Sequence, residues 1–434
     1  MKHTITLRYL IIIVASLCLL HQKKNDVRQW LGSHIEADAS VASAPRDVWL
    51  TVFVHGTIVL HPRFLIENIP SLKADKADQT LYGQVIEDSR SAPFLFENQT
   101  IQDLGLHRID EPYQRRGYAA GALAYVLDAL DYQQSHNYYY TFGWSGLISE
   151  SARIQAGAQL YNELSEEIEC YKQKGIVPKI RVIGYSHGGN VSLNMACNVD
   201  TSDWQVDELV TIGTPLQPPT DYMVTSPLFK QVYVLFSFGD KVQDRDVFSP
   251  YSSHRYFKND EGFDLPDSLT QIQIRVAKRV SDDHPVAPRE HSFMYQRPLS
   301  PGHIELWFFG WTPNYYRKRN PFYPLPTVAF VPYIIKQVQN QTLIHSPEQP
   351  LVVTLAPDQE LMSIACNDKD KDPIIVPFIP VETLDSLTET VLSEYKPHNY
   401  AQEYRRERDK IIKESIKRHL QARPTAAYCN DNQF

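Results

Sequence analysis

The sequence predicts an α/β fold, with a mostly parallel central sheet that carries helices on both faces. Short runs of β-branched residues alternate with segments of helical periodicity through most of the first 280 residues, which is typical of strands joined by helices. The run at 47–54 is continuously apolar, as a strand buried on both faces must be, whereas the run at 271–276 alternates like a half-buried strand. A chain of 434 residues, 43% hydrophobic and 22% charged, is long enough to bury such a core.

The first predicted strand spans residues 47–54, and the connection that follows it, up to about residue 116, is expected to be irregular because it is rich in proline and charge. Residues 149–174 are amphipathic with helical spacing, and Gly175 directly after them is the expected C-terminal cap of a helix. Further strands are expected at 136–146, a range that includes the turn after the strand, and at 179–185, 207–212, 231–238 and 271–276. Helices are expected at 117–130, 149–174 and 187–196. Beyond Trp311 we expect a helix near 331–338, strand-like runs at 351–355 and 374–378, and a surface helix or helix pair over 381–423.

Three regions are expected along the chain. Residues 1–45 hold a targeting segment and a linker, residues 46–340 form the α/β domain, and residues 341–434 form a C-terminal extension of short strands followed by helix. Within the domain, residues 58–135 make a long insertion. Insertions near an α/β site often act as lids or substrate walls, and a plain surface excursion is the alternative.

The N-terminus predicts export. Lys2 and Arg8 precede a twelve-residue apolar run, residues 9–20, which is too short for a comfortable membrane span and about right for a secretory signal. We therefore expect the α/β domain to lie outside the cytoplasm. No cleavage motif of small residues follows closely, so an uncleaved anchor that associates with a membrane is the alternative, and a buried first helix is another.

Charge and cysteine usage argue against several classes of protein. Acidic residues outnumber basic ones 51 to 43, giving a net charge of −8, which argues against a nucleic-acid partner. The five cysteines contain no C-x-x-C pair. Neither a disulfide framework nor a zinc site is therefore predicted.

Residues 184–188, Gly-Tyr-Ser-His-Gly, form the most informative motif. They lie between a predicted strand and a predicted helix, which is the context of a nucleophile elbow. The sharp turn presents the Oγ of Ser186 clear of the backbone, and Gly184 and Gly188 permit close approach of neighbouring segments. The helix N-terminus points at Ser186, so the His187 amide is an expected oxyanion donor. A Gly-rich turn without chemistry is the alternative.

A second oxyanion donor is expected where the first strand ends. His55-Gly56-Thr57 follows the apolar run directly, and a backbone amide in such a turn can face the carbonyl oxygen that Ser186 would attack. We expect the Thr57 amide to be this donor, with Gly56 allowing close approach of the backbone. The alternative is a tight turn in which His55 is simply a satisfied buried histidine.

The position of an acid follows from chain order. Catalytic groups of parallel α/β sheets collect at the carboxyl ends of the strands, and a nucleophilic serine is followed along such chains by an acid and then a histidine. Asp240 comes directly after the predicted strand 231–238. It is the expected acid, which would orient an imidazole. Asp244 and Asp246, on the same loop, are weaker candidates.

The base should be one of the histidines beyond the strand at 271–276, because it must reach both Ser186 and the acid from a later loop. His303 follows a Pro-Gly turn and precedes an apolar segment, so it ranks first. His291 ranks second and His284 third.

These motifs resemble, in type and order, landmarks of the α/β-hydrolase superfamily, more particularly of its lipase- and esterase-like members. The likeness covers about residues 46–310, and the long insertion at 58–135 departs from a minimal family core. The resemblance implies a Ser-Asp-His triad, a two-amide oxyanion hole and no metal or organic cofactor. The landmarks are Phe-Val-His-Gly-Thr at 53–57, Phe-Gly-Trp-Ser-Gly at 142–146, Ile-Gly-Tyr-Ser-His-Gly-Gly-Asn-Val at 183–191 and Ile-Gly-Thr-Pro at 212–215.

The sequence therefore predicts a serine hydrolase that cleaves carboxylic esters, with small-molecule or lipid esters as substrates. Lipid esters are suggested by the expected export and by the aromatic residues around the motifs. One alternative is an acyltransferase or thioesterase that uses the same triad. The other is a non-catalytic surface interaction module built on a hydrolase scaffold.

Overall fold

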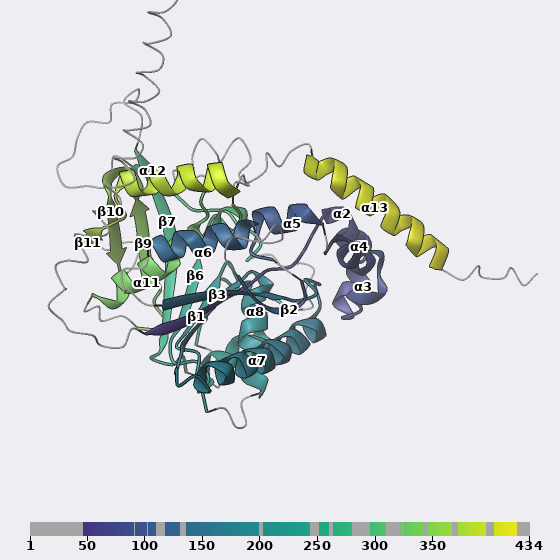
Figure 1. The fold of residues 1–434 in the computed structure, drawn as a ribbon, viewed down its shortest axis with the longest axis horizontal. Helices are drawn as coiled ribbons and strands as arrows, with labels where there is room; N and C mark the ends of the chain where they lie inside the picture. The colour runs from purple at the N-terminus through teal and green to yellow at the C-terminus, as the bar shows by residue number, and fades with distance from the viewer. Residues whose placement is uncertain are drawn as a thin grey trace, which may run out of the picture. The chain divides into compact units, whose positions relative to one another are not determined.

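An eleven-stranded sheet organises the fold of the computed structural model (Figure 1). Ten strands follow one path in the order β11-β10-β9-β7-β6-β5-β4-β1-β3-β2, and β8 pairs with β7. Every pair from β9 to β3 along this path is parallel. The pairs at both edges, and the pair of β7 with β8, are antiparallel. The predicted α/β class is confirmed.

The structure describes fourteen stretches of the unit that begins at Asp47. Residues 1–46, which include the predicted targeting segment, lie outside the described residues. The described stretches are 47–90, 92–101, 103–109, 118–130, 136–198, 203–243, 251–259, 264–279, 296–309, 322, 324–341, 346–366, 372–395 and 403–422.

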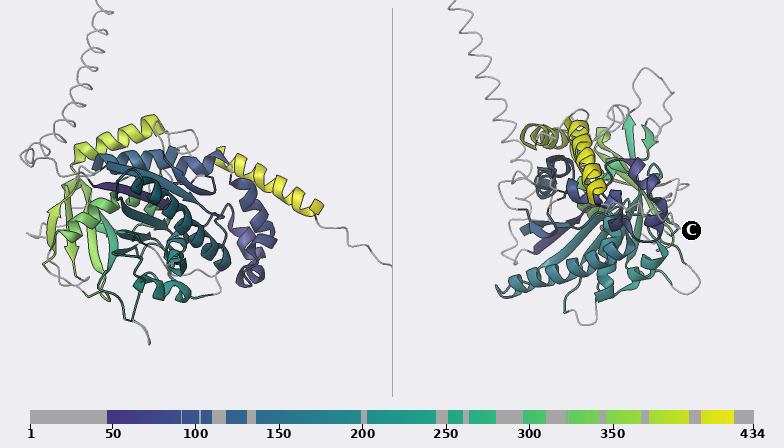
Figure 2. Two further views of the ribbon diagram at one scale, coloured as in Figure 1. Left: turned by 60° about the horizontal axis from the view of Figure 1, so that its bottom comes forward. Right: turned by 90° about the vertical axis from the view of Figure 1, so that its right-hand side faces the viewer.

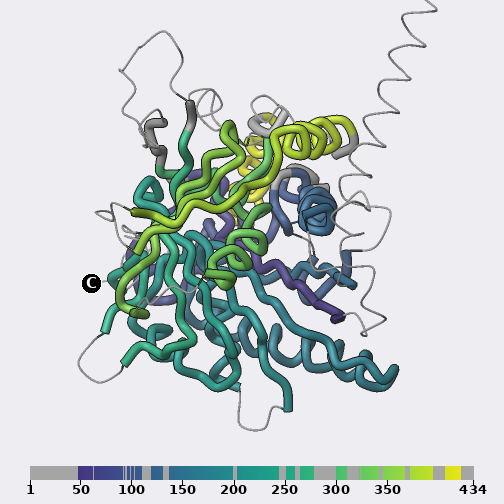
Figure 3. Tube along the Cα trace, turned by 90° about the vertical axis from the view of Figure 1, so that its left-hand side faces the viewer, coloured from purple at the N-terminus to yellow at the C-terminus, as the bar shows by residue number. Residues whose placement is uncertain are grey.

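The strands in the parallel part of the sheet include every strand predicted between residues 47 and 280. β9 pairs with β7 in parallel, so part of the predicted C-terminal extension continues the sheet; its green strands lie beside the teal ones in Figure 3. The parallel strands are β1 (Val48–Val54), β3 (His136–Gly143), β4 (Lys179–Tyr185), β5 (Glu208–Ile212), β6 (Val232–Phe236), β7 (Leu269–Arg279) and β9 (Leu351–Ala356). The antiparallel strands are β2 (Gly105–Arg108), β8 (Gln296–Leu299), β10 (Leu361–Ala365) and β11 (Ile374–Pro377).

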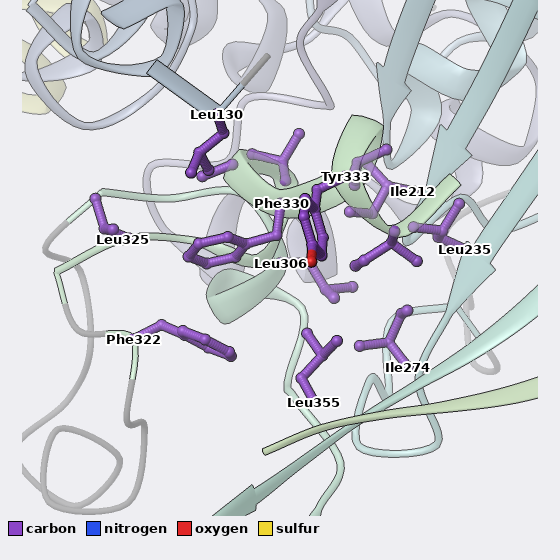
Figure 4. Close-up of a cluster of buried hydrophobic side chains, with 14 of the residues drawn as sticks. Leu130, Ile212, Leu235, Ile274, Leu306, Phe322, Leu325, Phe330, Tyr333 and Leu355 are labelled. Atoms are coloured by element: carbon purple, nitrogen blue, oxygen red, sulfur yellow. The ribbon is translucent and has the colours of Figure 1, made fainter. Parts of the chain in front are cut away.

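Successive side chains along a strand belong to two separate hydrophobic cores, one on each face of the sheet. On β1, Phe53 belongs to a cluster with α6, α11 and α12, whereas Val52 belongs to a cluster with α7 and α8. Helices therefore cover both faces, and α6 and α7 lie on opposite sides of the sheet in Figure 1. Part of the first core is shown in Figure 4. The helices are α6 (Tyr118–Leu130), α7 (Glu150–Lys172), α8 (His187–Asn194), α11 (Val331–Gln339) and α12 (Val381–Thr390).

Helix α7 begins and ends where its sequence signals predict. The Ser149 side chain accepts a hydrogen bond from the Ala152 amide at 3.1 Å, which is an N-cap. Asp75, from the insertion, accepts from the amides of Glu150 and Ser151 at 2.7 and 2.9 Å. At the other end, Gly175 adopts a φ of +75°, as a C-terminal cap requires.

The insertion after β1 is helical, contrary to the expectation of an irregular segment. Between residues 58 and 101, prolines lie in the first turn of three of the four α-helices that the structure describes there, where the missing N–H would be unsatisfied in any case. These prolines therefore start helices instead of preventing them. The helices are α2 (Pro62–Glu67), α3 (Ile69–Lys73), α4 (Leu81–Ser89) and α5 (Pro93–Asn98).

The last helix, α13 (Glu403–Ala422), packs against this insertion. Ile411 and Ile412 contact the hydrophobic cluster of the insertion. Ser415 donates to the Asp88 carboxylate, and Arg418 forms an ion pair with the same carboxylate at 2.6 Å. The yellow helix lies beside the purple helices of the insertion in Figures 1 and 2. The insertion and the last helix, for which the sequence indicates no definite role, thus contact each other.

Shorter elements connect the larger ones: a short helix α9 (Pro218–Asp221), 3₁₀ turns at Ala77–Gln79, Met195–Asn198, Tyr222–Thr225, Ile304–Leu306, Thr327–Phe330 and Pro357–Gln359, and a π-helical turn at Val391–Tyr395. None of the helices described is both long enough and apolar enough to cross a membrane.

Candidate active site

Ser186 occupies a strained turn between β4 and α8. Its backbone has φ +51° and ψ −132°, a region that costs energy for a residue with a side chain and persists only when its surroundings enforce it. Gly188 supplies part of that enforcement, because a Cβ there would lie 2.4 Å from the carbonyl oxygens of Val54 and His55. The elbow is therefore pressed against the end of β1, as the motif predicts.

The structure brings His303 and Asp240 to Ser186. The His303 Nε2 lies 3.1 Å from the Ser186 Oγ, and the His303 Nδ1 lies 2.6 Å from the Asp240 Oδ2. The other candidates, Asp244 and Asp246 for the acid and His284 and His291 for the base, lie outside the described residues.

Asp240 is fully buried and both of its carboxylate oxygens are engaged. The Oδ1 accepts from the amides of Val242 and Gln243 at 2.9 and 3.2 Å, while the Oδ2 faces His303. An ionised carboxylate only accepts hydrogen bonds, so the His303 Nδ1 must donate. The Nε2 of the neutral ring is then an acceptor, and it faces the Ser186 hydroxyl.

The loop that carries Asp240 is anchored to two neighbouring segments, one of them directly after β5. The Gln243 side chain donates to the Thr214 carbonyl at 3.1 Å, and the Arg255 guanidinium donates to the Asp240 carbonyl at 3.1 Å. Two side chains from different segments therefore fix the backbone of the acid, which favours a single carboxylate orientation toward His303.

The turn at 55–57 lies directly against Ser186. A Cβ on Gly56 would lie 2.7 Å from the Ser186 Cβ, so only glycine permits this approach. The His55 Nδ1 donates to the Gly56 carbonyl at 2.7 Å. In a trans peptide the next N–H points the opposite way, so the Thr57 amide points away from the His55 ring. It donates to no main-chain acceptor within the part of the chain that the structure describes.

The tautomer of His55 is set by Trp144. The Trp144 amide donates to the His55 Nε2 at 3.2 Å, and the Trp144 indole donates to the His55 carbonyl at 2.7 Å. Because the Nε2 accepts, the Nδ1 carries the proton. Burial, with a smaller contribution from Arg90, lowers the pKa of His55 to about 3, so the ring is neutral at physiological pH.

Arg90 links this turn to the insertion. Its guanidinium donates to the Trp144 carbonyl, and burial lowers its pKa to about 10, which leaves it charged at neutral pH. The Tyr82 hydroxyl, also in the insertion, donates to the Ile58 carbonyl at 3.2 Å. The insertion thus contacts the residue after Thr57 directly, and it reaches His55 on the other side through Trp144.

His187, the other expected oxyanion donor, is the first residue of α8 and is buried. Its Nδ1 lies 3.2 Å from the Asn190 side-chain nitrogen. Asn190 also donates to the Pro215 carbonyl at 3.0 Å and accepts from the Thr220 hydroxyl at 3.0 Å. The first turn of α8, whose N-terminus carries a partial positive charge, is thereby fixed beside Ser186.

Sequence reasoning did not assign roles to Tyr185, Trp144 or Arg90. Tyr185 and Trp144 lie within motifs that were recognised, and their positions next to glycines were the available signal. Arg90 lies in the insertion, where nothing in the sequence distinguishes it from a surface cation. Its burial is a property of the tertiary structure alone.

Among the described residues, no group of three or more histidine, cysteine, aspartate or glutamate side chains is arranged to hold a metal ion. Comparison with protein-family models, with curated proteins and with solved structures finds no match to this chain.

Proposed function

We propose that this protein is a serine hydrolase of the α/β-hydrolase type that cleaves carboxylic esters. The observation that carries the proposal is the pair of contacts from Ser186 to His303 at 3.1 Å and from His303 to Asp240 at 2.6 Å. A hydroxyl, an imidazole and a buried carboxylate in this order have the geometry of an activated nucleophile. The strained elbow and the chain order Ser, Asp, His support the same assignment.

In the proposed reaction, the His303 Nε2 accepts the Ser186 proton while the Oγ attacks the ester carbonyl carbon. The imidazolium formed is stabilised by Asp240. Collapse of the tetrahedral intermediate breaks the bond to the alcohol oxygen, which takes the proton from His303. Water then attacks the acyl-enzyme while His303 removes its proton. The bond between the acyl carbon and the Ser186 Oγ breaks, the Oγ takes the proton back from His303, and the carboxylic acid leaves.

Two backbone amides, of Thr57 and His187, are the proposed donors to the oxyanion. His187 follows Ser186 in the chain, and Thr57 follows Gly56, which lies against Ser186. The His55 side chain holds the Gly56 carbonyl, and Asn190 holds the His187 side chain. Such preorganised donors act where charge develops, and the loss of one costs on the order of 10²–10³ in turnover.

The proposed substrates are carboxylic esters, and the predicted export favours lipid esters among them. The fold itself does not determine the acyl group. A series of p-nitrophenyl esters from acetate to palmitate would identify it, and added alcohols would detect acyl transfer to an acceptor other than water.

The direct test is labelling by a fluorophosphonate probe, which reacts with an activated serine. The parent protein should be labelled and Ser186→Ala should not. Ser192→Ala is the matched control, because Ser192 lies on α8 two turns away and is fully buried, with its hydroxyl donating to the Gly188 carbonyl at 2.9 Å. Equal labelling of the parent and Ser186→Ala, or no labelling of a folded parent, contradicts the proposal.

A further inference from the structure

Tyr185, the residue before the proposed nucleophile, contacts the proposed base. Its hydroxyl donates to the His303 carbonyl at 2.9 Å. Its ring lies 4.8 Å from the His303 imidazole, centroid to centroid, with the ring planes tilted by 33°. Because Tyr185 and Ser186 are consecutive, one dipeptide carries both the nucleophile and a support for its base.

The Tyr185 ring is itself fixed by the segment that follows His303. It stacks on Trp307 at 5.0 Å with an angle of 8° between the planes, and Trp307 is fully buried. Leu306, next to it, reaches into the core shown in Figure 4. Tyr185 is only 3% exposed. The ring therefore has packed neighbours from residues on both sides of the 3₁₀ turn after His303 and little freedom to move.

The chemistry of the phenol suits this position. Burial, together with the nearby charges of Asp240 and Glu305, raises the pKa of Tyr185 well above its usual value, so the hydroxyl stays protonated and donates. The face of an aromatic ring attracts a cation within about 6 Å. An imidazolium formed when Ser186 loses its proton would lie within that range of the Tyr185 ring.

We propose that Tyr185 is a positioning residue that holds the His303 imidazole at hydrogen-bonding distance from the Ser186 Oγ. The backbone hydrogen bond fixes the main chain of His303, and the ring contact limits rotation of the imidazole. The catalytic part of this inference rests on the proposed hydrolase function. Displacement of a reacting group by about 1 Å costs on the order of 10²-fold in rate, so a modest shift of His303 is measurable.

The test compares Tyr185→Phe with Tyr333→Phe. Tyr333 is a matched control because its hydroxyl also donates to a backbone carbonyl, that of Pro377, at 2.8 Å. It is 7% exposed and belongs to the same hydrophobic cluster as Tyr185. Each variant loses one hydroxyl and keeps its ring, so thermal unfolding should show a similar loss of stability in both.

Catalysis should separate the two variants. Tyr185→Phe should lower kcat for a soluble ester about 10-fold with little change in KM, which is the order expected when one hydrogen bond is lost. Tyr333→Phe should keep the kcat of the parent. If both variants keep the parent kcat, or both lose it equally, the Tyr185 hydroxyl is only one more buried hydrogen bond and the inference is overturned.

A second readout needs no substrate. The proton between the His303 Nδ1 and the Asp240 Oδ2 should give a downfield ¹H NMR signal, which is assigned by its loss in His303→Ala. That signal should shift or broaden in Tyr185→Phe and stay in place in Tyr333→Phe. An unchanged signal in Tyr185→Phe overturns the positioning role. Because this measurement is independent of ester turnover, failure of the hydrolase proposal alone would leave it interpretable.

Discussion

Substitution of Gly56 by alanine tests whether the turn at 55–57 supplies an oxyanion donor. The added Cβ would lie 2.7 Å from the Ser186 Cβ, 3.0 Å from the Tyr185 Cδ1 and 3.1 Å from the Tyr185 carbonyl oxygen. Two of these atoms are held by the backbone of the elbow, which cannot rotate away. The turn must therefore withdraw from Ser186.

The size of the withdrawal follows from these distances. Ordinary van der Waals contact begins at 3.4 Å, about 0.7 Å beyond the 2.7 Å separation from the Ser186 Cβ. A donor displaced by this amount no longer meets the oxyanion at hydrogen-bonding distance. We expect kcat to fall about 10²-fold with little change in KM, because the contact is made chiefly in the transition state.

Gly157→Ala is the control for steric damage without effect on the site. A Cβ at Gly157 would lie 2.6 Å from the Asn194 Cβ and 2.8 Å from the Val191 carbonyl oxygen, at the end of α8 farther from Ser186. Both variants should lose about 1–3 kcal/mol of unfolding free energy through overpacking. Ester hydrolysis and thermal unfolding are measured on each. The reasoning is refuted if Gly56→Ala keeps the parent kcat, or if Gly157→Ala loses as much.

Three further predictions concern the acid, the buried histidine and the last helix. Asp240→Asn should lower kcat about 10⁴-fold, because an amide no longer selects the His303 tautomer; a loss below tenfold in ester turnover would contradict the role. The pKa of His55 falls from 6.5 in the unfolded chain to about 3 in the folded protein. The neutral ring therefore contributes fully to the free energy of unfolding above pH 6.5. Between pH 6.5 and 3 this free energy falls by up to about 1.4 kcal/mol per pH unit, because the unfolded chain binds the proton more readily. Urea unfolding between pH 7.5 and 5 should therefore show a steeper loss for the parent than for His55→Gln, and equal slopes would argue against a neutral buried ring. Ile412→Asp should lower the melting temperature and expose α13 to protease, because Ile412 contacts the cluster of the insertion. Leu420→Asp, at a position 64% exposed, should do neither, and similar behaviour of the two variants would mean that α13 is not docked through Ile412.

Most strands of the parallel sheet could be predicted from the sequence because burial on both faces favours a continuous apolar run, and β7 because its apolar and polar residues alternate. The helices α2 to α5 of the insertion could not be predicted. They are five to nine residues long, too short to be stable alone, and they depend on packing with one another and with α13. The strand β10 (Leu361–Ala365), which lies between β9 and β11, was also missed, since a strand of five residues has a weak pattern.

The sequence by itself determined the elbow at Ser186, the glycines around it and the order of the strand ends, because these follow from local geometry and from periodic burial. Only the tertiary structure decided that His303 lies 3.1 Å from Ser186, that Asp240 is fully buried and that Arg90 reaches Trp144. The contact of Arg90 with Trp144 joins residues 54 positions apart, and the contact of His303 with Ser186 joins residues 117 positions apart. Their distances are set by the packing of the whole sheet and its helices, which no local pattern encodes.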